Sequence, residues 1–276
     1  MNFLDSLSVH RIEADGAAYN VYMTGQGMPL LLLHGFTGSA ASWQHVLPQL
    51  ASRYRIIVPD LLGHGGTSAP DDPARYAIER QSADLAAILN ALNVDRAGLH
   101  GYSMGGRLAL YTAIAHPSRF SALSLESASP GLDAEAERVS RRRSDESLAA
   151  RILDRGVEVF VNEWEQLSLF LTQAALPPSV LAAQRNTRLN QRPLGLANSL
   201  RGMGTGMQPS LWDRLSELSM PVQLMTGALD AKFEAVADQM AQRIPHVRRI
   251  RVPDAGHTIY LERPELWLSA VLAFFD

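Results

Sequence analysis

The segment Gly101-Tyr102-Ser103-Met104-Gly105 constrains the fold of this chain more than any other part of its sequence. It lies between an apolar run at 97–100 and a helix-like run at 107–115. A serine with glycines two positions before and after it, at a strand-to-helix junction, is typical of the sharp turn that presents a nucleophile. A Cβ at either flanking position would collide with neighbouring backbone, so only glycine fits there. An ordinary glycine-rich turn is the alternative, and the surrounding sequence must decide between them.

A second motif lies upstream, where the apolar run 30–33 ends in His34-Gly35-Phe36-Thr37-Gly38. An unbroken apolar run is typical of a strand that is buried on both faces of a parallel sheet. The glycines after it allow main-chain N–H groups to point inward. We therefore predict an oxyanion hole formed by the backbone amides of Phe36 and Met104. His34 lies within the tight turn, where a structural hydrogen bond to loop backbone explains it better than a role as a base.

Strand and helix signals alternate along the rest of the chain. Strands are predicted at 55–58, 97–100, 122–126, 222–225 and 248–252, and helices at 41–51, 78–92, 104–115, 234–243 and 264–275. Segments 8–13 and 17–23 flank Ala14-Asp15-Gly16 and indicate a hairpin that adds antiparallel strands at one edge. Alternation of this kind predicts a mainly parallel sheet flanked by helices. The layout resembles the α/β-hydrolase fold.

That fold orders its catalytic residues as serine, acid and histidine along the chain. Asp230 follows the predicted strand 222–225, and His257 follows the predicted strand 248–252. Both would lie at the carboxyl ends of strands, where open α/β sheets bind their ligands. We therefore predict a catalytic triad of Ser103, Asp230 and His257, in which the imidazole takes the serine proton and the carboxylate orients the imidazole. The alternatives are that Asp230 only caps a helix and that His257 is an ordinary loop residue. Asp254 is the rival acid, but it is too close to His257 along the loop to reach the imidazole.

The alternation is interrupted between about 129 and 208, where only helical stretches are predicted, at 133–154, 156–171, 179–190 and 194–201. A helical insertion between strands predicts a lid over the ligand crevice. The expected division is therefore a core formed by 1–128 and 209–276, with a helical lid at 129–208.

Arginines are concentrated in the predicted lid, at Arg138 and Arg141-Arg142-Arg143. Consecutive helical residues rotate by about 100°, so these side chains cannot all face one pocket. The spacing predicts ion pairs of Arg141 with Asp145 and of Arg142 with Glu146, which indicates a solvated face for most of them.

Arg107 is a different case, because it lies four residues after Ser103 on the helix that follows the serine turn. A guanidinium near this helix start faces the same side as the nucleophile and predicts an anion site. A surface arginine is the alternative, although this helix should be buried in the core.

Composition limits the remaining possibilities. The net charge is -3, which gives no general reason to expect a nucleic-acid or membrane partner. The chain has no cysteine, which excludes disulfides, thiolate chemistry and the common zinc sites, and we predict neither a metal nor a cofactor. Residues 1–14 have no long apolar core, so no signal peptide is expected, and a cytoplasmic location follows. The sequence leaves the oligomeric state open.

Several motifs together resemble one enzyme family over essentially the whole chain. The residues that carry the resemblance are Gly101 to Arg107, Glu126 to Leu132, Arg141 to Asp145, Trp164, Leu200 to Gln208 and Asp230 to Phe233. They are similar to the menaquinone-pathway enzyme 2-succinyl-6-hydroxy-2,4-cyclohexadiene-1-carboxylate synthase, usually called MenH. That family eliminates pyruvate from 2-succinyl-5-enolpyruvyl-6-hydroxy-3-cyclohexene-1-carboxylate, so the resemblance implies a lyase that hydrolyses no bond.

The resemblance also implies roles for further residues. His257 would deprotonate Ser103, the serine or the pair would remove the ring proton next to the succinyl carbonyl, and the oxyanion hole would stabilise the charge that forms. The substrate, a small polyanionic carboxylate, would be bound by Arg107, Arg141, Arg188, Tyr102, Trp164 and Lys232, with the arginines as carboxylate clamps. For Lys232, an exposed lysine at a helix start is the alternative.

Two other functions remain open at this point. An esterase or carbon–carbon bond hydrolase of the same fold could use the same triad, but we would expect its lid to be apolar. A ligand-binding protein without activity would tolerate a broken triad.

Overall fold

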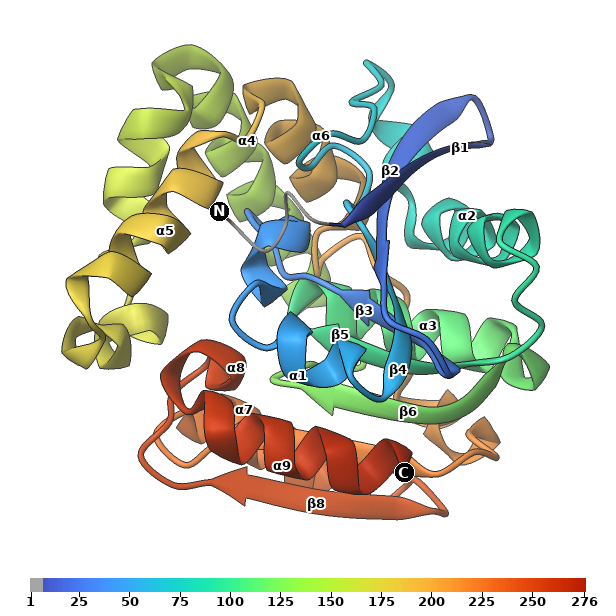
Figure 1. The fold of residues 1–276 in the computed structure, drawn as a ribbon. Coiled ribbons are helices and arrows are strands. Elements are labelled where there is room, and N and C mark those ends of the chain that lie inside the picture. Colours follow the sequence, from blue (N-terminus) through green and yellow to red (C-terminus); the bar gives the residue numbers. More distant parts are fainter. Residues whose placement is uncertain (1–6) are drawn as a thin grey trace.

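An eight-stranded sheet forms the centre of the computed structural model, which describes residues 7–276 (Figure 1). The strand order across the sheet is β1-β2-β4-β3-β5-β6-β7-β8. The strands are β1 (Ser8–Ala14), β2 (Ala17–Thr24), β3 (Met28–Leu33), β4 (Tyr54–Pro59), β5 (Ala97–Tyr102), β6 (Phe120–Glu126), β7 (Val222–Gly227) and β8 (Val247–Val252). β1 and β2 pair antiparallel, as does β2 with β4, and all other pairs are parallel. The predicted hairpin and the predicted fold class are confirmed.

The sheet is covered on both faces because its central strands carry apolar side chains in both directions. Leu31 and Leu33 of β3 belong to one hydrophobic core, while Leu30 and Leu32 belong to the other. Successive strand residues point to opposite faces, so the unbroken run 30–33 supplies both cores. Each fully buried leucine contributes about 2 kcal/mol to stability by leaving water.

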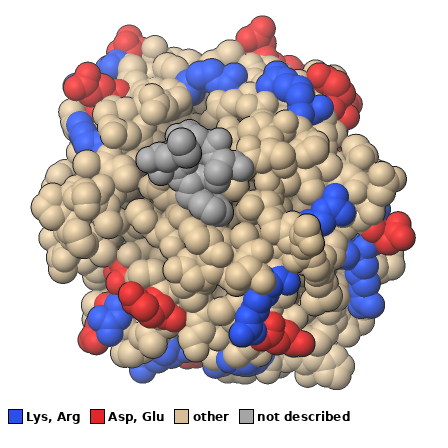
Figure 2. Space-filling view, viewed as in Figure 1, with Lys and Arg blue, Asp and Glu red and all other residues tan. Residues whose placement is uncertain are grey.

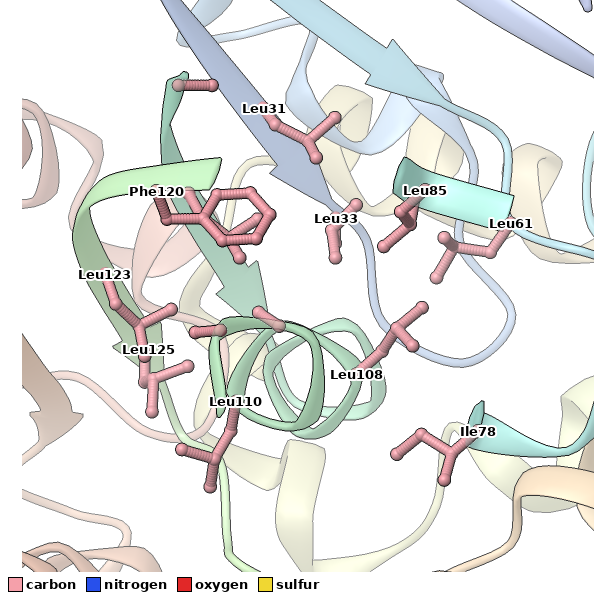
Figure 3. Packing of buried hydrophobic residues seen from close by; sticks show 14 of the residues in the cluster. Leu31, Leu33, Leu61, Ile78, Leu85, Leu108, Leu110, Phe120, Leu123 and Leu125 are labelled. Carbon is pink, nitrogen blue, oxygen red and sulfur yellow. The ribbon is translucent and has the colours of Figure 1, made fainter. Parts of the chain in front are cut away.

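The helices are α1 (Leu47–Ala51), α2 (Ile78–Ala91), α3 (Met104–Ala115), α4 (Glu135–Trp164), α5 (Pro178–Leu189), α6 (Pro193–Met203), α7 (Ala231–Ala241), α8 (Ile259–Glu262) and α9 (Pro264–Phe275). Short 3₁₀ helices are η2 (Ala40–Trp43), η3 (Pro73–Tyr76), η4 (Pro117–Arg119), η5 (Ser168–Ala175) and η6 (Trp212–Glu217). Side chains of α2, α3 and α7 enter the first core, and those of α1 and α9 enter the second. Figure 3 shows Leu108 and Leu110 of α3 in the core that they share with side chains from β3 and β6.

The predicted helix at 41–51 is wrong as a single element. The structure has the 3₁₀ helix η2 and the short helix α1 in its place, with Pro48 in the first turn of α1. Proline has no N–H and its ring clashes with the carbonyl four residues earlier, so a helix can begin near Pro48 but cannot run through it.

The long segment between β6 and β7 is helical, and no strand is assigned between 127 and 221. In Figure 1, α4, α5 and α6 gather in the upper left, whereas α9 lies beside β8 at the bottom. The predicted break near 155 is present, because Gly156 has φ 80° and ψ 170° and divides α4 into two parts. The predicted helix 156–171 is too long, since α4 ends at Trp164 and η5 begins separately at Ser168.

The part of the surface seen in Figure 2 mixes Lys and Arg with Asp and Glu. Among residues 7–276, no helix has both the length and the apolar character needed to cross a membrane.

Candidate active site

The turn between β5 and α3 has the strained geometry that the glycine pattern predicts. Ser103 adopts φ 51° and ψ -110°, which is rare for a residue with a side chain. A Cβ on Gly101 would lie 2.7 Å from the Cα of Gly106, and one on Gly105 would lie 2.5 Å from the carbonyl oxygen of His34. Both distances are too short for any side chain. The glycines therefore allow β5, α3 and the neighbouring loop to meet behind the serine.

The structure brings Ser103, His257 and Asp230 together from three distant parts of the chain. Ser103 Oγ lies 3.0 Å from His257 Nε2, and His257 Nδ1 lies 2.7 Å from Asp230 Oδ2. The second carboxylate oxygen of Asp230 accepts a hydrogen bond from the amide of Phe233 at 3.3 Å, so this residue also caps α7. Helix capping, considered as the alternative role of Asp230, thus occurs together with the contact to the imidazole.

Two carboxylates for which no role was predicted hold the loop that carries His257. Glu262 accepts hydrogen bonds from the amides of Gly256 at 2.7 Å and Thr258 at 3.1 Å, one on each side of the histidine. Glu126, at the end of β6, accepts from the amides of Ile259 and Tyr260 and from an indole N–H. Their positions could not be read from the sequence, because they depend on how β6 and α8 meet.

His34 and Asp254, the other residues considered for catalysis, have different surroundings. His34 Nε2 accepts from the amide of Leu61 at 3.0 Å, and Nδ1 lies 2.8 Å from the carbonyl oxygen of Gly35. Burial lowers the pKa of His34 to about 3, so its ring is neutral and serves the loop backbone. Asp254 is exposed and lies 3.4 Å from Arg263, as expected for a solvated turn residue.

The backbone amide of Phe36 lies in the loop after β3, and that of Met104 belongs to the first residue of α3, directly after the serine. Within residues 7–276, neither amide donates to a main-chain carbonyl. Two unpaired N–H groups at the start of α3 and in the neighbouring loop are suited to stabilise an oxyanion. Their use for that purpose stays a prediction.

A cavity of about 630 Å³ opens from the serine and the histidine toward the helical segment 129–208. It lies in the size range that is common for small-molecule sites. Four cationic side chains contribute to its lining, and they are Arg107, Arg141, Lys232 and Arg243. The acidic side chains that also contribute are Asp133, Glu137 and Asp145.

Arg107 is the most unusual of these cations, because it is largely buried and has no carboxylate within ion-pair distance among residues 7–276. Its Nη1 atom donates to two neutral acceptors, the carbonyl oxygen of Met203 at 2.9 Å and Oε1 of Gln208 at 2.7 Å. Burial, with the nearby charge of Arg141, lowers its pKa to about 10, so it remains protonated at neutral pH. The charge of Asp145 opposes this lowering of the pKa, but it forms no ion pair with Arg107, and a desolvated cation of this kind favours an anionic ligand.

The arginines of the helical segment 129–208 divide into different environments, as the helical rotation predicts. Arg141 donates from Nε to Asp145 at 2.8 Å, which confirms the first predicted ion pair. The predicted pair of Arg142 with Glu146 is wrong. Arg142 instead contacts Glu135 at 2.7 Å and the carbonyl oxygen of Gly206. Glu146 pairs with Arg201, because α4 packs against α6 there.

Arg188 lies apart from the large cavity. It lines a small neighbouring pocket, donates to Glu165 at 3.0 Å and stacks over the ring of Phe170 at 5.1 Å. Phe170 lines both cavities, as do Phe36 and Tyr102, so the two cavities share a wall.

The other predicted binding residues, Tyr102, Trp164 and Lys232, all line the large cavity. The indole N–H of Trp164 is buried without a partner among the described residues. Lys232 is exposed, with its ammonium 5.6 Å from the Phe233 ring centroid. The exposed Arg243, which stacks over Trp212 at 4.8 Å, was not foreseen, because it is remote from every motif.

The comparisons with known proteins agree with this architecture. A model of the alpha/beta hydrolase fold family matches residues 28–264. A Bacillus subtilis protein named "Putative 2-succinyl-6-hydroxy-2,4-cyclohexadiene-1-carboxylate synthase" is 44% identical over 263 residues, which cover 95% of this chain and 96% of the relative. The solved structure of MenH from S. aureus matches with a TM-score of 0.89 and 36% identity, over 93% of this chain and 97% of that chain. The chain belongs to this synthase family of α/β-hydrolases.

Solved structures that are similar to this chain include a protein with another activity. A thermophilic esterase from Thermogutta terrifontis, solved with malate bound, matches with a TM-score of 0.84 and 28% identity, over 98% of this chain and 97% of that chain. Fold alone therefore does not separate a synthase from an esterase, and the side chains of the cavity must do so.

Proposed function

We propose that this protein eliminates pyruvate from 2-succinyl-5-enolpyruvyl-6-hydroxy-3-cyclohexene-1-carboxylate to give 2-succinyl-6-hydroxy-2,4-cyclohexadiene-1-carboxylate. The observation that carries the proposal is the cavity, which joins a Ser-His-Asp arrangement to the guanidinium of Arg107, a largely buried cation that forms no ion pair among residues 7–276. Such a site favours a substrate with several carboxylates over a neutral ester. The names of the relatives point to the same reaction.

In this proposal the triad acts as a base. His257 takes the proton of Ser103 through Nε2, and Asp230 holds the imidazole so that Nε2 is free to accept it. The seryl oxygen removes the ring proton next to the succinyl carbonyl, and the electron pair moves onto the carbonyl oxygen. The amides of Phe36 and Met104 donate to that oxygen. When the electron pair returns, the C–O bond to the enolpyruvyl group breaks, and the leaving group takes up a proton to become pyruvate.

The cations would bind the carboxylates of the substrate. Arg107 and Arg141 belong to the large cavity, so they are the clamps that need the least rearrangement. Arg188 pairs with Glu165 and lines the neighbouring pocket, so it could serve as a further clamp only after a rearrangement. Tyr102 and Trp164 would line the ring of the substrate, and Lys232 would contribute charge at the rim.

We also propose that residues 129–208 act as a lid over the core that 1–128 and 209–276 form. Many of the cavity's residues come from this segment, which supports a role in substrate contact. A cytoplasmic location and independence from metals, cofactors, nucleic acids and membranes belong to the same proposal.

An esterase of the same fold is the alternative, because a triad and an oxyanion hole serve either chemistry. The structural similarity to an esterase that was solved with malate bound supports this alternative. The charges in the cavity argue against a neutral ester as the natural substrate.

Substitutions in the triad test the mechanism. Ser103→Ala, Asp230→Asn and His257→Ala should each remove most pyruvate release while leaving the thermal unfolding midpoint within a few degrees of the unsubstituted protein. Residues that act as one unit fail together, so double variants should be little worse than the worst single variant. Near-native turnover of Ser103→Ala would exclude the serine as the base.

A further inference from the structure

A hydrogen bond between two hydroxyl groups joins the residue before Ser103 to the residue after His257. Thr258, which follows the histidine, places Oγ1 2.8 Å from the hydroxyl of Tyr102, which precedes the serine. All of these side chains except that of Ser103 are buried. The hydroxyl of Thr258 therefore links the turn after β5 to the loop before α8.

A third segment reaches the same atom. Gln173 of η5, in the helical insertion, donates from Nε2 to Thr258 Oγ1 at 2.9 Å and is only 4% exposed. In a 3₁₀ helix, residues three apart share a face, and Phe170 is accordingly buried on the same side as Gln173. Leu171, on another face of η5, is 61% exposed. One edge of η5 therefore faces the histidine loop.

The packing between η5 and this loop is tight. A Cβ on Gly256 would lie 3.0 Å from the Cβ of Thr172, so no larger residue fits there without displacing η5. The ring of Phe170 has its centroid 6.3 Å from that of His257. These contacts hold the side-chain amide of Gln173 in a fixed position beside Thr258. A polar contact at the surface would not be held in this way.

We propose that Gln173 is a positioning residue for the Ser103–His257 pair and that it acts through Thr258. A threonine hydroxyl has one proton and two acceptor sites, so the bond from Gln173 and the bond to Tyr102 together fix its orientation. The main chain of the histidine loop is held separately by Glu126 and Glu262. Loss of Gln173 should therefore loosen the alignment of the pair without unfolding the loop.

A double-mutant cycle tests this inference, which rests on the proposed function for its activity readout. Gln173→Ala should lower kcat for pyruvate release about tenfold and leave KM within about twofold, because one buried hydrogen bond is lost and the substrate contacts are kept. Thr258→Val should have a similar effect, and Thr258→Ser, which keeps the hydroxyl, should retain kcat within about threefold. Adding Gln173→Ala to Thr258→Val should cost less than about twofold more, since the two residues act through one bond. The control is Gln166→Ala, an exposed glutamine seven positions earlier in the chain, which should change neither constant.

A second readout separates failure of this inference from failure of the proposed function. The proton between His257 and Asp230 should give a low-field NMR resonance in the unsubstituted protein, whether or not pyruvate is released. Gln173→Ala should shift or broaden that resonance, and Gln166→Ala should not. An unchanged resonance in Gln173→Ala would overturn the inference. The inference would also be overturned if Gln173→Ala lowered kcat by the same factor in the unsubstituted protein and in the Thr258→Val variant. Absence of pyruvate from the unsubstituted protein would instead overturn the proposed function and leave the NMR test decisive for Gln173.

Discussion

Replacement of Arg107 by methionine should separate function from stability. In the proposed site its guanidinium meets a substrate carboxylate in a desolvated cavity, where loss of a charge-assisted pair costs about 3 kcal/mol, or roughly a hundredfold in kcat/KM. The folded protein loses only the hydrogen bonds to Met203 and Gln208, each worth about 1 kcal/mol. The Arg107→Met variant no longer buries a charge whose pKa is lowered from 12.5 to about 10, and this stabilises its folded state by about 3 kcal/mol. The free energy of unfolding should therefore change by no more than about 1 kcal/mol.

The assay is pyruvate release at several substrate concentrations, together with urea unfolding of the same preparation. The matched control is Arg142→Met. Arg142 does not contribute to the lining of the cavity, and its guanidinium contacts Glu135 and the carbonyl oxygen of Gly206. It should leave kcat/KM within about twofold and cost at most about 1 kcal/mol of stability. Equal losses of kcat/KM in the two variants would refute the distinction between cavity and surface arginines. So would a large loss of stability in Arg107→Met with unchanged turnover.

Further predictions concern the fold. Gly101→Ala should cost about 3 kcal/mol, because its Cβ would lie 2.7 Å from a backbone carbon of α3, whereas Gly156→Ala, with φ 80° but no atom within 4 Å, should cost about 1 kcal/mol. Urea unfolding measures both, and equal losses would contradict the packing argument. Burial lowers the pKa of His34 to about 3 and that of His64 to about 4, below the usual 6.5, so the unfolded chain binds more protons in this range. Between pH 7 and pH 5 stability should therefore fall by about 2 kcal/mol for each histidine, against an opposing gain of about 1 kcal/mol from Asp60, whose pKa burial raises to about 6. An unfolding free energy that stays constant between the two pH values would show that these side chains are not buried as described.

The sequence predicts the centre of the site well because that part is encoded locally. The glycines around Ser103 indicate a close approach of backbone segments, and Ser103, Asp230 and His257 follow the carboxyl ends of the parallel strands β5, β7 and β8. A strand was predicted at the place of every strand of the sheet, although β1 and β8, at its two edges, carry charged residues and are not apolar runs.

The parts that the sequence did not predict depend on which distant elements meet. The partners of Arg107 come from the end of α6 and the loop after it, and Glu165 holds Arg188 because α4 and α5 pack together. Periodicity along one helix gave Arg142 the wrong partner, because Arg201 of α6 pairs with Glu146. Arg142 pairs instead with Glu135, two turns earlier in α4, and with the carbonyl oxygen of Gly206 in a distant loop. Side-chain pairing across elements is a tertiary property, so spacing within one element can only suggest it.

The most direct test of the proposed reaction is to give the purified protein both classes of substrate. With 2-succinyl-5-enolpyruvyl-6-hydroxy-3-cyclohexene-1-carboxylate and no metal or nucleotide in the enzyme step, a coupled assay should detect one pyruvate for each substrate consumed, and Ser103→Ala should abolish it. Small neutral p-nitrophenyl esters should be turned over slowly or not at all, because they offer no carboxylate to the cations of the cavity. Rapid ester hydrolysis without pyruvate release would contradict the account and identify the protein as a hydrolase.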